Sequence, residues 1–102
     1  MTHSASEQSV LSLHKRLTFE LKDELLNKDL QYDKMMLAKE VLHENEKMYD
    51  VLQSTALSQN DALLSLLNVL GTMLEAQKQV NAYRFGYNES IIKLYSLLGV
   101  PL

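Results

Sequence analysis

Apolar residues recur every three or four positions from Val10 to Leu52, apart from gaps of seven before Tyr32, Leu42 and Tyr49, which is the spacing of one face of an α-helix. No proline or glycine interrupts residues 5–57, so the pattern predicts one helix over about 5–57, roughly 75 Å long. The polar stretch 43–46 is the place where this helix could break. Ser4 and Glu7 have the spacing of a capping box and predict where the helix starts.

The next interruption lies at 58–61, where Ser, Asn and Asp side chains can bond to their own backbone and favour a turn. A second helix is predicted over about 61–98. Gly99 suits the left-handed position after a helix, and Pro101 cannot continue one. We therefore expect an all-α fold in a single domain, residues 1–102. It would be a long antiparallel helical hairpin or a small helical bundle, with coiled-coil-like packing.

A heptad repeat runs along the second predicted helix, in alternating steps of four and three residues. This period is typical of long helices that wrap around a neighbour. The ten positions are Leu66, Leu70, Met73, Gln77, Val80, Arg84, Tyr87, Ile91, Leu94 and Leu98. Eight of the ten are apolar, and Gln77 and Arg84 are the exceptions. Within this set we expect the buried seam at Val80, Tyr87, Ile91, Leu94 and Leu98.

Charge is divided unevenly, with 17 of the 23 charged side chains in residues 1–50 and six in residues 51–102. The second helix also carries apolar residues off the seam, more than one partner helix could cover. These residues are Leu63, Leu64, Leu67, Val69, Leu74, Phe85, Ile92, Tyr95 and Leu97. Either the first helix folds back to make a three- or four-helix bundle, or copies of the chain associate, and we expect association.

The predicted interface combines the seam with a second face, on which we place Phe85, Ile92 and Tyr95. The full set is Leu66, Leu70, Met73, Val80, Phe85, Tyr87, Ile91, Ile92, Leu94, Tyr95 and Leu98. Tyrosines, with an apolar body and a polar tip, are common at protein interfaces. A platform for nucleic-acid bases would need a positive groove beside the aromatic rings, and only Arg84 and Lys93 are near.

Composition narrows the classes of partner and of chemistry. The net charge is −3 with acids and bases interspersed, so the chain has no basic surface for nucleic acid. It has no cysteine, which excludes disulfides and thiol nucleophiles. The first residues lack the pattern of a signal peptide and no stretch is apolar enough to span a membrane, so we expect a cytoplasmic protein.

The polar residues do not form a recognisable catalytic or metal-binding pattern. The three histidines have no metal-ligand spacing, and the acids alternate with lysines as on a solvated helix face. We expect no metal, no cofactor and no enzymatic activity. Gly71 and Gly86 stand alone inside the helical pattern, and we expect close packing against a neighbour there in preference to a hinge.

Four segments carry a family resemblance: LLNVL (66–70), LEAQKQV (74–80), AYRFGY (82–87) and LYSLLG (94–99). Residues 63–99 resemble the last coiled-coil helix of the outer-membrane efflux factor (TolC-like) family, and residues 35–49 more weakly resemble its partner helix. The resemblance implies a trimeric tube of antiparallel helices that serves as an export duct. The chain has one helical repeat where the family has two, and Ser58-Gln-Asn where the family usually has a glycine. We therefore expect an excised hairpin, which would be periplasmic, a truncated relative, or an unrelated helical protein.

The leading hypothesis is a non-enzymatic helical interaction protein that self-associates or docks on a protein partner through the second helix, with a homo-oligomer expected. The alternative is a small cytoplasmic chaperone or adaptor of a secretion or regulatory system, whose apolar face is occupied by another chain. A third hypothesis, a cryptic enzyme or ligand pocket in a monomeric four-helix bundle, predicts a concave pocket with convergent polar groups.

Overall fold

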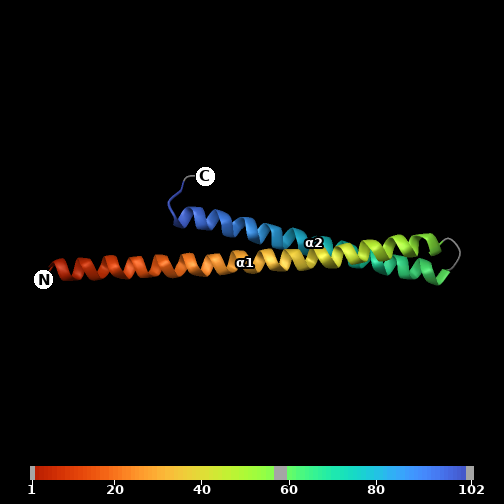
Figure 1. The fold of residues 1–102 in the computed structure, drawn as a ribbon, viewed down its shortest axis with the longest axis horizontal. Helices are drawn as coiled ribbons and strands as arrows, with labels where there is room; N and C mark the ends of the chain where they lie inside the picture. Colours follow the sequence, from red (N-terminus) through yellow and green to blue (C-terminus); the bar gives the residue numbers. More distant parts are fainter. Residues whose placement is uncertain (1, 57–59, 101–102) are drawn as a thin grey trace.

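The protein is an all-α helical hairpin of two antiparallel helices, α1 (Thr2–Ala56) and α2 (Asn60–Leu97) (Figure 1). The computed structural model describes the backbone of residues 2–56 and 60–100, and the side chains of 6–55 and 62–100. The hairpin is a rod of 86 × 22 × 14 Å. Because α1 does not fold back on itself, the chain is a hairpin and not a bundle.

The helix α1 is continuous through the polar stretch 43–46. Such a long helix follows from the absence of proline and glycine, together with many residues of high helix propensity. The structure corrects the predicted start, because α1 begins at Thr2 and Ser4 lies inside the first turn, not at the N-cap. The turn predicted at 58–61 falls largely outside the described residues, and Asn60 is already the first residue of α2.

The two helices contact each other along one seam. Near the turn α2 crosses α1, and toward its C-terminal end α2 lies to one side of α1 (Figure 1). Buried and half-buried positions recur in steps of three and four on both helices. On α1 they include Leu21, Glu24, Lys28, Gln31, Met35, Ala38, Leu42, Asn45, Tyr49 and Leu52. On α2 they include Ala62, Leu66, Val69, Met73, Ala76, Val80, Tyr83, Tyr87, Ser90, Leu94 and Leu97.

The observed seam of α2 corrects half of the predicted one. Leu66, Met73, Val80, Tyr87 and Leu94 lie in it, but the other five members are displaced by one residue. The structure uses Val69, Ala76, Tyr83, Ser90 and Leu97 in place of Leu70, Gln77, Arg84, Ile91 and Leu98. Leu98, for example, is 60% exposed. The displacement keeps Gln77 and Arg84 in water. It also places the small side chains of Ala76 and Ser90 at the seam, where they let the helices approach closely.

The best-buried apolar cluster of the seam consists of Met35, Ala38 and Val80, with Leu42 and Tyr83 packed against it. Aromatic contacts flank this cluster. The rings of Tyr32 and Tyr87 are 5.8 Å apart, and the ammonium of Lys34 lies 5.8 Å from the centre of the Tyr83 ring. Such cation–ring contacts are attractive, so the lysine contributes to the packing as well as to solubility.

The two glycines inside α2 have different surroundings. A Cβ atom added to Gly86 would stand 2.7 Å from Oε1 of Gln31, so α1 packs closely against this position. This contact is the close packing predicted for the glycine. A Cβ atom added to Gly71 would meet nothing within 4 Å, so the same prediction for Gly71 is not met inside the hairpin.

The end of α2 is a Schellman motif, as Gly99 and its φ of 73° indicate. The amide of Val100 donates to the carbonyl of Tyr95 at 3.0 Å, and the amide of Gly99 donates to the carbonyl of Ser96 at 3.1 Å. These bonds satisfy carbonyls that a helix end otherwise leaves unpaired. The predicted role of Gly99 as the left-handed residue after the helix is confirmed.

Candidate protein-interaction surfaces

The first uncovered surface is the N-terminal part of α1. The N-terminal part of α1 extends past the C-terminal end of α2, and we call residues 6–20 the overhang (Figure 1). Every one of these residues is exposed. The large apolar side chains among them are Val10, Leu11, Leu13, Leu17 and Phe19. The overhang therefore presents an apolar helix surface with no partner in the described part of the chain.

A second uncovered surface runs the length of α2, beside the seam, and we call it the outer stripe. It repeats in steps of four and three through Leu63, Leu67, Leu70, Leu74, Gln77, Asn81, Arg84, Asn88, Ile91, Tyr95 and Leu98. Leu70 and Ile91 are half-buried, and the other nine residues are exposed. Leu67 and Leu74 are 55% and 67% exposed, although leucine normally favours the interior.

The outer stripe has apolar ends and a polar centre. Gln77, Asn81, Arg84 and Asn88 form the centre. Arg84 has no hydrogen bond or ion pair with any described residue of its own chain. Leu64, Phe85 and Ile92 lie directly beside the stripe and are also exposed, which widens the apolar surface toward both ends.

The predicted interface residues are divided between the seam and this outer surface. Leu66, Met73, Val80, Tyr87 and Leu94 pack toward α1 within the hairpin. Leu70, Ile91, Tyr95 and Leu98 belong to the outer stripe, and Phe85 and Ile92 flank it. The sequence contains both stripes, and the predicted interface joins alternate members of each because both follow the same heptad spacing.

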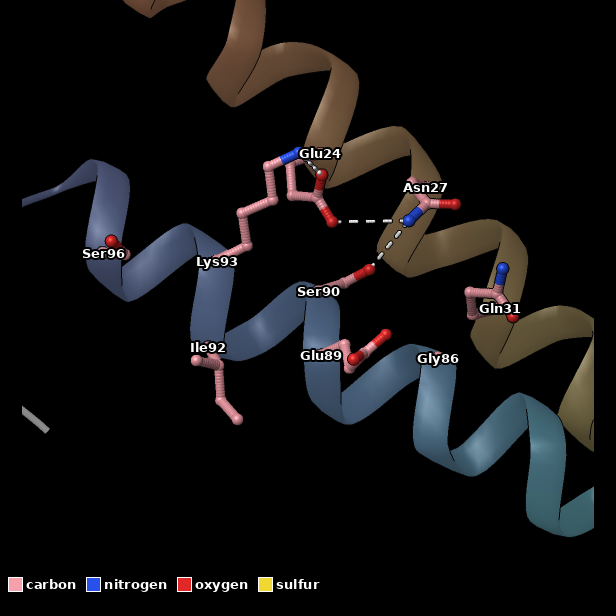
Figure 2. Close-up of a pocket in the computed structure, with 9 residues that line it drawn as sticks. All are labelled: Glu24, Asn27, Gln31, Gly86, Glu89, Ser90, Ile92, Lys93 and Ser96. Carbon is pink, nitrogen blue, oxygen red and sulfur yellow. Dashed lines mark hydrogen bonds and ion pairs between the residues drawn. The ribbon is translucent and has the colours of Figure 1, made fainter.

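A polar cluster interrupts the apolar seam toward the end of α2 (Figure 2). Glu24 and Asn27 on α1 meet Ser90 and Lys93 on α2. The amide of Asn27 donates to Ser90 Oγ at 2.9 Å and to Glu24 Oε1 at 3.3 Å, and Lys93 Nζ lies 3.2 Å from Glu24 Oε2. Ser90 is 2% exposed and Glu24 is 8% exposed, and no buried side-chain polar atom of the described residues lacks a partner.

The partners of Glu24 hold its carboxyl group ionised. Burial alone would raise the pKa of Glu24, but hydrogen bonds from Ser90, Asn27 and Lys93 and the charge of Lys93 together lower it below the ordinary value. The groove beside this cluster is also lined by Gln31, Gly86 and Glu89. Because the cluster satisfies its own groups, it functions as a polar layer between the helices. No local sequence pattern predicts a contact between residues so far apart.

Metal-binding arrangements are not found among the residues that the structure describes. No group of three or more histidine, aspartate and glutamate side chains is placed to hold a metal ion there. His14 and His43 are both exposed. Within the same residues, neither helix has a window apolar enough to cross a membrane.

Comparison with known proteins gives no further assignment. No protein-family model, no curated protein and no solved structure matches the chain.

Proposed function

We propose that the protein is a non-enzymatic helical interaction module that self-associates through the outer stripe of α2. The observation that carries the proposal is the exposure of this stripe, in which Leu63, Leu67, Leu74 and Leu98 are each at least half exposed. Exposed apolar patches such as those at the two ends of this stripe usually mark an interaction site on a folded protein.

The small core of the hairpin supports the same conclusion. Among the described residues, seven hydrophobic side chains are buried, whereas 23 large ones are exposed. Several of the buried seven are alanines, which bury little apolar area. A helix pair with so thin a core gains stability when a further helix covers its remaining apolar faces.

Analytical ultracentrifugation tests the proposal at micromolar concentrations. The wild-type chain is expected to sediment as a species larger than 11.7 kDa. Replacing Leu67 and Leu74 by glutamate should shift it toward the monomer, because two charges would be desolvated in the contact. The matched control replaces Asn68 and Thr72, which are exposed on the neighbouring polar face, and adds the same two charges.

The control should leave the association unchanged, and circular dichroism should show that all the variants remain helical. A wild-type chain that is helical and strictly monomeric at tens of micromolar would contradict the proposal. An interface with a micromolar dissociation constant would already form oligomers at that protein concentration.

The resemblance of residues 63–99 to efflux-factor helices supports a more specific form of the same function, in which the hairpin belongs to the periplasmic coiled coil of an export assembly. The overhang favours a second candidate, a chaperone or adaptor of a secretion or regulatory system. Its five large exposed apolar residues would suit a helix of a different protein. Recovery of one foreign protein in a fixed ratio, lost when Leu13 and Leu17 are replaced by glutamate, would favour the adaptor.

A further inference from the structure

The part of the outer stripe between Leu67 and Leu98 has the same order of residue types when it is followed from either end. From Leu67 to Leu98 it has three apolar residues, four polar residues and three apolar residues. The centre of this pattern lies between Ala82 and Tyr83. A surface that is symmetric along its length is complementary to an antiparallel copy of itself, which is the requirement for a two-fold interface.

We propose that two copies pack through their α2 helices, antiparallel, around a two-fold axis beside residues 82 and 83. The proposal rests on the self-association proposed above and specifies its geometry. In this arrangement the apolar ends of one stripe cover the apolar ends of the other. The three pairs, each formed twice, are Leu67 with Leu98, Leu70 with Tyr95, and Leu74 with Ile91.

The polar centres of the two stripes also meet. Gln77 of one copy faces Asn88 of the second copy, and Asn81 faces Arg84. The amide oxygen of Asn81 can accept a hydrogen bond from the guanidinium of Arg84, which has no partner within its own described chain. Each polar side chain of the centre thereby opposes another polar side chain.

The pattern selects one alignment of the two helices. A shift of one heptad in one direction would place Leu74 against Arg84 and Leu70 against Asn88. The opposite shift would place Asn81 against Ile91. Either shift would bury polar groups against apolar side chains, which is unfavourable. A polar position inside an apolar helix contact is a known way to fix alignment and partner number.

The residues that would face one another also disfavour a contact between the outer stripe and the exposed apolar residues of α1. On its own edge, α1 exposes Leu37, Val41 and Met48. Side-by-side packing of hairpins at the same level would place Arg84 of one copy beside Lys34 of the next, because Lys34 lies at the level of Tyr83. Two positive charges placed side by side repel each other, whereas the two-fold pairing gives Arg84 an amide partner.

The contact is long enough for a specific dimer. Residues 67–98 of a helix extend about 46 Å, and a contact one helix diameter wide would cover roughly 1,000 Å² in total over the two copies. This area is near the lower limit of specific interfaces, so a micromolar dimer is expected. The seam and the outer stripe lie about 100° apart around α2, which leaves room for α1 and the second copy at the same time.

Cysteine cross-linking tests the geometry, and the absence of native cysteine makes the result unambiguous. Leu74→Cys and Ile91→Cys chains are prepared separately, mixed, and treated with a short thiol cross-linker. The mixture should give a cross-linked heterodimer in high yield. Leu74→Cys alone should not cross-link, because antiparallel pairing separates the two copies of residue 74 by about 25 Å.

Sedimentation of the wild-type chain distinguishes a failure of the proposed self-association from a failure of the proposed antiparallel pairing. A mass of twice 11.7 kDa with the expected cross-links supports both. An oligomer in which Leu74→Cys alone cross-links as well as the mixture would overturn the antiparallel pairing and leave self-association standing. A monomeric wild-type chain would overturn both. Ser65→Cys, on a polar face of α2, is the control for random collision and should give no product.

Discussion

Gln31 of α1 rests against Gly86 of α2 so closely that a Cβ atom at Gly86 would be 2.7 Å from its Oε1. This close contact favours a residue without a side chain at position 86. The atom in the way is the end of a flexible side chain, which can rotate aside at some loss of packing. Gly71, which faces open space in the same helix, provides a matched comparison.

We therefore expect Gly71→Ala to stabilise the hairpin by about 0.5–1 kcal/mol, because alanine loses less conformational freedom in a helix than glycine. Gly86→Ala should gain less, because Gln31 must move. Urea unfolding at one fixed protein concentration measures both. An equal gain at the two positions would show that Gln31 does not restrict residue 86.

The ionised state of Glu24 makes stability depend on pH. The pKa of Glu24 is lowered in the folded protein, so its contribution is fully present above the pKa of the unfolded chain. That contribution is lost as the pH falls through the lowered pKa of the folded state. Wild-type protein should therefore lose more unfolding free energy than Glu24→Gln between neutral pH and about pH 3. Glu75→Gln, at an exposed position, should retain the wild-type slope.

Ala76 is 3% exposed at the seam, and its small side chain helps set the spacing of the helices. Ala76→Leu should destabilise the hairpin by about 1–3 kcal/mol, because the larger side chain forces the helices apart or into strained rotamers. Ala82→Leu introduces the same side chain at an exposed position and should change stability little. Thermal unfolding of the two variants compares these effects, and an equal change in both would argue against the assigned seam.

Arg84 is expected to weaken the dimer while it fixes the alignment. Arg84→Leu should lower the dimer dissociation constant, because it removes a charge that the contact would desolvate. The same change should allow other alignments of the two helices. Leu74→Cys chains should then cross-link with cysteines at positions that give no product in the protein that keeps Arg84. Sedimentation equilibrium measures the first effect and cross-link mapping the second. Weaker association of Arg84→Leu would indicate that Arg84 contributes attraction instead.

The sequence predicted the two long helices because their signals are local, but it left a hairpin and a small bundle open. Continuous helices follow from the missing proline and glycine, and Gly99 indicated the end of α2. The seam was predicted only in part, because its alternate members, such as Ser90 and Ala76, are small or polar and do not stand out by hydrophobicity. Leu70 and Ile91, one residue away, give the stronger apolar signal but belong to the outer stripe.

The polar cluster could not be predicted at all from local pattern. Glu24 and Lys93 lie on different helices, and each appears in the sequence as an ordinary charge on a solvated helix face. Only the alignment of the two helices brings them together. Asn27 and Ser90 are equally unremarkable as single residues, although their hydrogen bond spans 63 positions of the chain.

The overhang of α1 acquires a particular consequence in an antiparallel dimer. Each copy extends its overhang past the end of its own α2, so the two overhangs would point away from each other at opposite ends of the particle. Their centres would lie roughly 70 Å apart. Such a particle is a bivalent tether: it could hold two identical targets at a fixed distance, and binding of the first would raise the effective concentration of the second.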